Sequence, residues 1–247
     1  MITLKSAREI GLMRSSAQIL KIVLLELEKN VRDGISTKEL DDIAESVIRD
    51  HKALPSFKNY HGFPASICTS INEEVVHGIP SKDRVLKNGD IISVDVGVKF
   101  EGYHSDAART WAVGNISEKA KKLIEVTEAS FFKGIDIIKP GSRLGDLSST
   151  IQDYVEKHNF SVVRDFVGHG IGSNLHEEPQ IPNFGTKNTG SILENGMTLA
   201  IEPMVNAGTW KVRILENNWT VVTQDNALSA HYENTVAIIE GNVEVLT

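Results

Sequence analysis

Four carboxylates and one imidazole stand at positions where a strand or a glycine-rich turn would direct them into the protein interior. They are Asp95, Asp106, His169, Glu202 and Glu233. Bare carboxylates cannot share a dry pocket, because like charges at close range cost several kcal/mol each. Two divalent cations placed among them would resolve that conflict. The set therefore predicts a hydrolytic site with two metal ions.

The chemistry of these ligands narrows the choice of metal. Four oxygen donors and one nitrogen donor suit Co²⁺, Mn²⁺, Fe²⁺ or Zn²⁺ better than a cysteine-based structural zinc site. The sequence does not choose among these four ions. Two ions held ~3.5–4 Å apart would activate a water molecule and polarise a carbonyl group. We therefore expect a cofactor of two divalent metal ions and an enzyme that hydrolyses its substrate.

A short hairpin accounts for the first two carboxylates. An alternating strand that contains Asp95 runs up to Glu101-Gly102, which can form a two-residue hairpin loop. In that register Asp95 pairs with Ala108, and Asp106 becomes its diagonal neighbour on the same face. Such neighbours lie ~7–8 Å apart, within reach of a shared ion. A slip of one residue would place the two carboxylates on opposite faces.

The other three ligands also lie at turns or strand ends. His169 lies in Gly168–Gly172, where three glycines in five residues disfavour a helix and allow another chain to approach closely. No strand–helix–strand unit surrounds this run, so we exclude dinucleotide binding. Glu202 ends a short strand before Pro203, which cannot continue the ladder. Glu233 stands at the entry to an apolar strand.

An internal repeat relates the two halves of the chain. Matching residues lie 107 positions apart: Gly34 and Gly141, Leu40 and Leu147, Val47 and Tyr154, His51 and His158, Gly89 and Gly196, and Asp95 and Glu202. The same offset superposes two helices and two of the acids. We expect a single catalytic domain over 1–247, with halves of about 1–115 and 116–247 related by a pseudo-twofold axis and the metals between them. The alternative is a chance similarity of two ordinary helices.

Hydrophobic periodicity and caps predict an α+β fold with a largely antiparallel sheet. Capping boxes at Ser6–Glu9 and Ser36–Glu39 open the first two helices. The first helix has Ile10, Met13, Leu20, Val23, Leu24 and Leu27 near one face. The predicted helices are Ser6 to about Lys29, Ser36–His51, Ser117–Ile138 and Arg143–His158. The predicted strands are 65–72, 91–100, 103–113, 161–168, 197–202, 211–223 and 232–246.

Composition excludes several classes of protein. A net charge of -7 argues against a DNA-binding protein. Cys68 is the only cysteine, so no internal disulfide can form, as is usual in a reducing compartment. Lys5, Arg8 and Glu9 interrupt any apolar run that could act as a signal peptide, and no segment is long enough for a membrane helix. We expect a cytoplasmic protein.

Two further histidines could act on a substrate. His77 follows an apolar pair, and His176 lies seven residues beyond His169. Either could stabilise an oxyanion or transfer a proton to a leaving amine, and either could instead be a capping or surface residue. Glu177 and Glu178 are interpreted as solvated charges, and the segment is not the HExxH of a zinc protease.

Taken together, these residues resemble the type I methionine aminopeptidases, whose fold is called pita-bread. The resemblance covers essentially the whole chain. The matching motifs are Tyr60-His61-Gly62-Phe63-Pro64, Ser70-Ile71-Asn72-Glu73, His77-Gly78-Ile79-Pro80, Gly89-Asp90-Ile91, Gly168-His169-Gly170-Ile171-Gly172, His176-Glu177-Glu178-Pro179-Gln180, Ile201-Glu202-Pro203-Met204 and Tyr232-Glu233-Asn234-Thr235.

The resemblance implies a curved antiparallel sheet covered by helices and a metal-dependent aminopeptidase of the short bacterial type. Its metal ligands correspond to the five residues already identified: Asp95, Asp106, His169, Glu202 and Glu233. Its catalytic residues correspond to His77, His176 and Glu202, with Glu202 handling a proton of the attacking water. Its substrate-binding residues correspond to Tyr60, Phe63, Cys68, His77, Leu175, His176 and Trp219, with Phe57 nearby.

The implied reaction is removal of the initiator methionine from nascent proteins whose second residue is small. His176 would stabilise the oxyanion, and His77 would assist the departing amide nitrogen. The expected partners are nascent polypeptide N-termini and, transiently, the ribosome. The resemblance also implies a monomer, with no membrane or DNA partner.

The sequence leaves three alternatives to a methionine aminopeptidase. Prolidases and X-Pro aminopeptidases share the fold, although they usually carry an additional N-terminal domain. A catalytically inactive binding module could keep the fold, although such proteins tend to lose ligands and all five are present here. A metal-free structural protein would leave buried carboxylates without partners.

Overall fold

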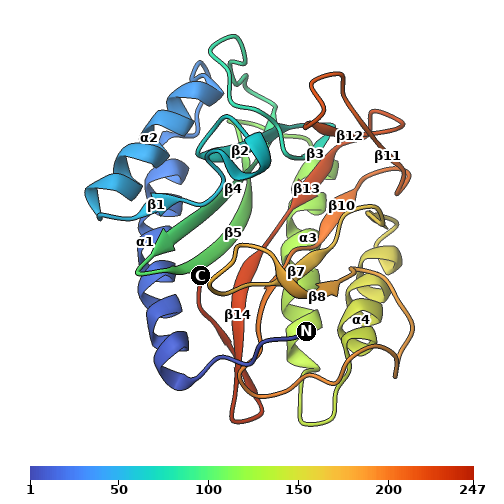
Figure 1. Cartoon of the computed structure of the whole chain (residues 1–247). Helices are drawn as coiled ribbons and strands as arrows, with labels where there is room; N and C mark the ends of the chain where they lie inside the picture. The colour runs from blue at the N-terminus through green and yellow to red at the C-terminus, as the bar shows by residue number, and fades with distance from the viewer.

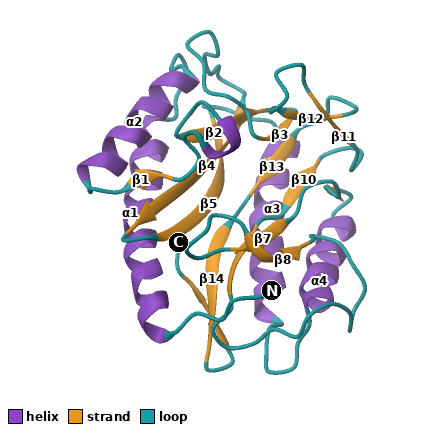
Figure 2. Cartoon of the chain, in the orientation of Figure 1, coloured by secondary structure: helices purple, strands orange, loops and turns teal.

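The computed structural model describes residues 1–247 and has an α+β fold, as predicted. In Figures 1 and 2, α1 and α2 lie at the left, α3 runs behind the central strands, and α4 lies at the right. The helices are α1 Ala7–Asn30, α2 Thr37–Asp50, α3 Glu118–Asp136 and α4 Leu144–Lys157, with a 3-10 turn at Tyr60–Gly62. The strands are β1 Leu54–Pro55, β2 Ile67–Ile71, β3 Glu74–Val76, β4 Ile91–Phe100, β5 Tyr103–Ala112, β6 Ser161–Val162, β7 Gly168–Gly170, β8 Glu177–Ile181, β9 Thr198–Ile201, β10 Met204–Asn206, β11 Val212–Ile214, β12 Val221–Thr223, β13 Ser229–His231, β14 Asn234–Ile239 and β15 Asn242–Val245.

The helices begin where the sequence predicts. Ser6 with Glu9 and Ser36 with Glu39 form complete capping boxes at the starts of α1 and α2. Ser117 caps α3 by accepting a hydrogen bond from the amide of Ala120. The six apolar residues expected on one face of α1 are all buried. The first three helices thus begin at a side-chain cap, whereas at the start of α4 the amide of Arg143 donates to Oδ2 of Asp146. All four helices bury an apolar face.

Every strand pairing is antiparallel, which confirms the predicted character of the sheets. The largest sheet has the order β15-β14-β9-β7-β8. A second sheet has the order β1-β4-β2, with β5 paired to β4. Two three-stranded sheets, β13-β10-β6 and β11-β12-β3, complete the framework.

The hairpin of β4 and β5 has the predicted register. Asp95 pairs with Ala108, and Gly97 pairs with Asp106, so both carboxylates lie on one face. The loop residues Glu101 and Gly102 have φ values of 48° and 88°, the left-handed conformation that a tight two-residue turn requires.

Three predicted strands are wrong as continuous elements. The strand expected over 161–168 ends at Val162, because the chain bends after it and β7 starts only at Gly168. The segment 211–223 is a hairpin of β11 and β12, and 232–246 is a hairpin of β14 and β15. The second of these turns at Glu240-Gly241, with positive φ at both residues, just as Glu101-Gly102 does. The predicted strands omit β1, β3, β8, β10 and β13, and they include only the first residue of β7.

The repeat offset recurs in the backbone contacts. Isolated bridges join Ser36 to Val85 and Arg143 to Ile192, and the two bridges are 107 residues apart at both ends. Gly89 and Gly196, which match in the repeat, have φ values of 102° and 89°. The assignment of the chain to one catalytic domain with two halves stays a prediction.

Separate apolar clusters support the two sides of the molecule. One packs α3 and α4 against strands of the second half, and another packs α1 and α2 against β2, β4 and β5. A third cluster includes Phe57, Phe63, Cys68 and Leu175, which border the predicted site. None of the helices combines the length and apolar character needed to cross a bilayer.

Candidate metal centre

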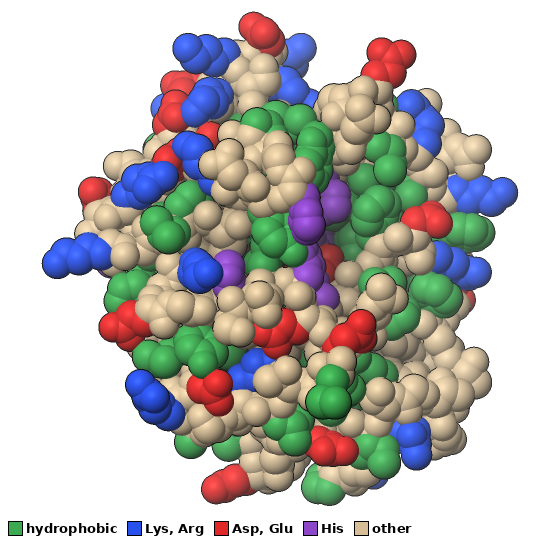
Figure 3. Space-filling view, viewed as in Figure 1, with side chains coloured by type: hydrophobic (Ala, Val, Ile, Leu, Met, Phe, Trp, Pro, Cys, Tyr) green, Lys and Arg blue, Asp and Glu red, His purple; other side chains and the backbone are tan.

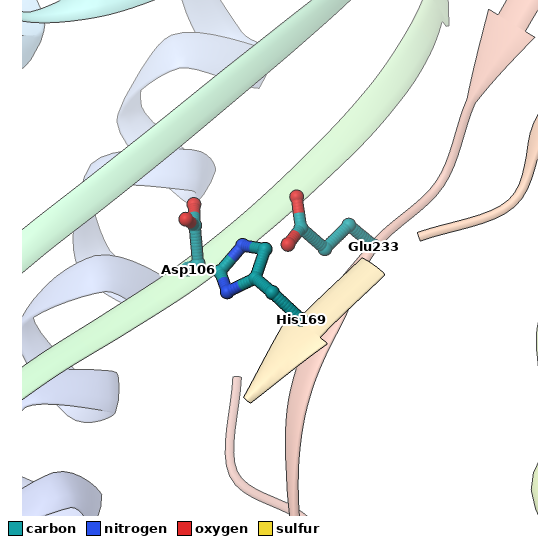
Figure 4. A group of neighbouring side chains, drawn as sticks. All are labelled: Asp106, His169 and Glu233. Carbon is teal, nitrogen blue, oxygen red and sulfur yellow. The ribbon is translucent and has the colours of Figure 1, made fainter. Parts of the chain in front are cut away.

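The five predicted ligands converge on one place. One ligand atom each from Asp106, His169 and Glu233 lies within 4.8 Å of the others. Figure 4 shows these three side chains pointing toward one another from β5, β7 and the segment between β13 and β14. Glu202, just beyond β9, has Oε1 3.6 Å from Nε2 of His169. Asp95 lines the same cavity from β4, beside Asp106.

Backbone hydrogen bonds between the halves hold Glu233 in place. Its amide donates to the carbonyl of Ala108 at 3.0 Å, and the amide of Ala108 donates back at 3.3 Å. The Arg109 guanidinium also donates to the carbonyl of Glu233 at 2.6 Å. Since Ala108 pairs with Asp95 across the hairpin, the ligands of β4, β5 and the β13–β14 segment are fixed as one unit.

Glycine is required around His169 because other strands pass very close. A Cβ at Gly168 would lie 2.4 Å from the carbonyl oxygen of Ala200, and one at Gly170 would lie 2.1 Å from that of Glu178. The predicted close approach of backbone is therefore the packing of β7 between β8 and β9. Nδ1 of His169 lies 2.9 Å from the carbonyl of Gly170, so that nitrogen donates and Nε2 faces the carboxylates.

Burial makes the ionised forms of these acids costly. Desolvation raises the pKa of Asp95 to about 7. Desolvation, followed by repulsion from neighbouring carboxylates, raises the pKa of Asp106, Glu202 and Glu233 well above the ordinary range. Burial also lowers the pKa of His169 to about 3, which keeps its imidazole neutral.

Several buried oxygens in this cluster have no hydrogen-bond partner. They are Oδ1 of Asp95, Oδ1 of Asp106 and Oε1 of Glu233. Carboxylate oxygens without hydrogen-bond partners, together with a neutral imidazole, are ligands that a divalent cation binds. A cation would also offset the repulsion between the carboxylates. The residues present therefore fit a divalent metal ion.

A cavity of about 240 Å³ opens over the cluster. It is lined by Phe57, Tyr60, His61, Phe63, Cys68, His77, Asp95, Asp106, His169, Leu175, His176, Glu202, Trp219 and Glu233. Every residue predicted for metal, catalysis or substrate is in this set, and His61 is an addition. Figure 3 shows histidines gathered in the central hollow, with apolar side chains around them. Larger hollows exist elsewhere, including one of about 510 Å³ between α1 and α3, but they lack a comparable carboxylate cluster.

The wall of this cavity is apolar and aromatic. The rings of Phe63 and Trp219 meet edge to face with centroids 5.1 Å apart. Cys68 pairs with Asp95 in the sheet, and burial raises the pKa of its thiol well above the usual range. A protonated thiol and two rings form a slot suited to an unbranched, polarizable side chain.

The two candidate catalytic histidines, His77 and His176, both line the cavity. Nδ1 of His176 is 2.7 Å from the hydroxyl of Tyr60, and its ring centroid is 4.2 Å from that of His169. His77 has a left-handed backbone with φ of 60°. Gly78 after it packs so tightly that a Cβ would lie 1.9 Å from the carbonyl oxygen of Thr69. The strained turn thus aims the His77 ring at the site.

The interpretation of Glu177 as a solvated charge is wrong. Glu178 is exposed, as expected for a solvated charge, but Glu177 forms an ion pair with Lys5. Both side chains are largely buried, at 10% and 3% exposure. Lys5 lies in the N-terminal segment, which also donates a backbone hydrogen bond to Gly196. The segment therefore fastens the loop that carries His176.

We expect Lys5→Met to destabilise the protein, because it leaves the Glu177 carboxylate buried without its partner. It should also lower kcat, because the loop that carries His176 is no longer fastened by this ion pair. Removing one member of a buried pair costs about 3–5 kcal/mol. Thermal unfolding and steady-state kinetics measure the two effects. Lys187→Met is the matched control, since Lys187 pairs with Asp153 at high exposure and the change should cost at most about 1 kcal/mol. Equal effects of the two substitutions would contradict the assignment.

One buried histidine near the cluster is not among the residues that the sequence predicts for the site. His231 is 1% exposed, and its Nε2 lies 3.8 Å from an oxygen of Glu202 and 3.8 Å from an oxygen of Glu233. The available signal was spacing, because residues two apart on an extended segment share a face. Burial lowers the pKa of His231 to about 3, so the ring is neutral.

An antiparallel α+β framework with a buried carboxylate–histidine cluster under a substrate-sized cavity defines a metal-dependent hydrolase. The model of metallopeptidase family M24 matches residues 11–240. The chain belongs to this family, among its methionine aminopeptidases. It is 57% identical to the methionine aminopeptidase of Clostridium acetobutylicum and 56% identical to methionine aminopeptidase 1 of Bacillus subtilis, in each case over 100% of this chain and 99% of the relative.

Solved structures agree with this assignment. The methionine aminopeptidase of Thermotoga maritima superposes with a TM-score of 0.98 at 46% identity, covering 100% of this chain and 99% of that one. The prolidase of Pyrococcus furiosus has a TM-score of 0.79 at 22% identity, and the match covers 65% of its length. The prolidase likeness shows the shared pita-bread fold only. The family membership confirms the expected enzyme class and divalent metal binding.

Proposed function

We propose that this chain removes the N-terminal methionine from nascent polypeptides whose second residue is small, using two divalent metal ions. The observation that carries the proposal is the buried cluster of four carboxylates and one imidazole at the floor of a 240 Å³ apolar cavity. The residues that would hold the ions are Asp95, Asp106, His169, Glu202 and Glu233. When bound, divalent ions lower the pKa of water and polarise a scissile carbonyl.

The side chains around the cluster supply the remaining roles. Glu202 is placed to accept a proton from the attacking water, because its carboxylate borders both the cavity and His169. His176 is placed to donate to the developing oxyanion. The Tyr60 hydroxyl beside Nδ1 favours the tautomer that has its hydrogen on Nε2. We assign to His77, which lines the same cavity, the role of assisting the departing amide nitrogen.

The cavity supports methionine as the side chain bound. Tyr60, Phe63, Cys68, Leu175 and Trp219 enclose a narrow apolar space, and a thioether fills such a space well. The limited volume leaves room for the methionine and little beyond it, which favours a small second residue. We further propose that the enzyme acts in the cytoplasm as a monomer and meets its nascent substrates transiently at the ribosome.

A peptide panel tests the function. With Mn²⁺ or Co²⁺ added to the purified chain, Met-Ala-Ser should be cleaved to free methionine, and Leu-Ala-Ser and Met-Leu-Ser should be cleaved much more slowly. Gly-Pro tests the prolidase alternative. Preferential cleavage of Gly-Pro, or metal binding without any peptide cleavage, would replace the proposal by the prolidase or the inactive-module alternative.

We expect His176→Ala to lower kcat on Met-Ala-Ser about a hundredfold, the scale of a lost oxyanion donor. Metal content should stay unchanged, because His176 lies at the exposed entrance of the cavity. Tyr60→Phe should give a smaller loss, since it removes only the hydrogen bond that orients the imidazole. A His176→Ala enzyme that loses its metal would instead assign this histidine to the ligands.

A further inference from the structure

His231 is a buried polar side chain aimed at the metal centre that the proposed mechanism does not use. It is the last residue of β13 and lies two residues before Glu233. Its Nε2 has no hydrogen-bond partner. One ligand atom each from Glu202, His231 and Glu233 lies within 4.8 Å of the others. An orphaned ring nitrogen facing two carboxylates requires an explanation, because burying it unpaired costs about 1–3 kcal/mol.

Glu202 is bracketed by two imidazoles. Its Oε1 is 3.6 Å from Nε2 of His169, and its Oε2 is 3.8 Å from Nε2 of His231. The same nitrogen of His231 is 3.8 Å from Oε2 of Glu233. These contacts make His231 a common neighbour of the last two carboxylates.

The backbone of His231 is held by the other half of the protein. Its amide donates to Oγ1 of Thr110 at 2.9 Å, and that hydroxyl donates to the His231 carbonyl at 2.8 Å. Thr110 Oγ1 also lies 2.8 Å from Oγ of Ser93 on β4. Met204 pairs with His231 from the opposite strand. The imidazole is therefore presented from a rigid frame that includes β4 and β5, which carry Asp95 and Asp106.

We propose that His231 is a positioning residue, whose Nε2–H donates to the carboxylates of Glu202 and Glu233 and fixes them for metal binding. The inference deepens the proposed function and rests on it. A hydrogen bond to a carboxylate is short, about 2.7–2.9 Å, so the 3.8 Å separations must close by roughly 1 Å when the carboxylates draw together. Partners of this kind orient metal ligands, and their loss typically costs about 10–100-fold in metal affinity or activity.

Three substitutions separate a hydrogen-bond donor from a metal ligand. His231→Gln keeps an N–H at similar reach, His231→Asn shortens that reach by one methylene, and His231→Leu removes the donor. We expect Leu and Asn to weaken Mn²⁺ binding about 10–100-fold by titration calorimetry and to lower kcat on Met-Ala-Ser with little change in KM. The Gln variant should recover most of both, with the wild-type number of ions.

His104→Leu is the matched control. His104 is also buried, at 7% exposure, but its Nδ1 bonds the Ser56 hydroxyl and its ring is outside the metal-binding groups. It should lower the thermal midpoint without changing Mn²⁺ affinity. If His231→Leu does not fold, the Gln and Asn pair still gives the comparison, because both side chains are polar amides.

Two outcomes would overturn the proposal. If the Gln variant binds one ion fewer than wild type, His231 is itself a ligand, because an amide is a poor replacement for an imidazole at a metal. If the Leu variant matches wild type in both Mn²⁺ affinity and kcat, the residue has no role at the centre. The calorimetric measurement of Mn²⁺ binding needs no peptide. A protein that does not remove methionine would contradict the proposed function, but its His231 variants could still be compared by their Mn²⁺ affinity.

Discussion

Asp106→Asn is expected to abolish hydrolysis of Met-Ala-Ser, with kcat/KM falling at least about a thousandfold. Asp106 is 3% exposed, and its Oδ1 has no hydrogen-bond partner. It lies between Asp95 on the neighbouring strand and the His169–Glu233 pair, so it would be a central ligand of the proposed metal site. Losing it removes several kcal/mol of transition-state stabilisation, at a factor of ten for each 1.36 kcal/mol.

Asp106→Asn should abolish activity, but it should not lower the stability of the metal-free protein. In metal-free protein the neutral amide removes a buried carboxylate whose pKa is raised by burial and by Asp95 and Glu202. The metal-free variant should therefore unfold at a temperature equal to or higher than metal-free wild type, and added Mn²⁺ should no longer stabilise it. Asp83→Asn makes the same chemical change at an exposed loop and should alter neither property. Wild-type turnover by the Asp106 variant would discard the metal assignment.

The sequence predicts the centre well where local rules decide the geometry. The Glu101-Gly102 turn sets the register of β4 and β5, and that register alone places Asp95 and Asp106 on one face. The capping boxes define where α1 and α2 begin. The 107-residue repeat relates Asp95 to Glu202 before any contact between the halves is known.

The features that the sequence does not predict depend on contacts between residues far apart in the chain, which no local rule describes. Lys5 and Glu177 are 172 residues apart, and nothing near either residue predicts that the other will neutralise it. The turn at Glu240-Gly241 has the same signature as Glu101-Gly102, yet the apolar residues on both sides of it predict one continuous strand. His231 was overlooked because a lone histidine in a strand is ordinary. Its importance comes from the orphaned nitrogen, which only the assembled fold reveals.

Removing the metal is expected to make stability fall as pH rises above about 6.5. The pKa of Asp95 is raised to about 7, and those of Asp106, Glu202 and Glu233 are raised well above normal, chiefly by burial. In this range the unfolded acids have already lost their protons, while the folded ones keep them. The folded state therefore binds more protons, and the free energy of unfolding decreases by about 1.4 kcal/mol per pH unit for each proton of difference.

The buried histidines determine how far below pH 6.5 this loss of stability with rising pH extends. Burial lowers the pKa of His77 to about 4 and those of His169 and His231 to about 3, so below about pH 6.5 the unfolded state gains protons that the folded state refuses. Their contribution rises with pH and opposes that of the acids. Above about pH 6.5 they are neutral in both states, and only the acids remain. Because these histidines largely cancel the acids below about pH 6.5, the steep loss of stability is expected only above that pH.

Thermal unfolding of chelator-treated protein from pH 6.5 to 8 checks this expectation, at about 2–4 °C for each kcal/mol in a chain of this length. With saturating Mn²⁺ the slope should flatten, because carboxylates bound to a cation stay ionised in the folded state. Metal-free Asp106→Asn should show a shallower slope than metal-free wild type, since one of the titrating acids is gone. A midpoint that rises with pH in the metal-free protein, or an equal slope with and without Mn²⁺, would mean that these carboxylates do not share a buried site.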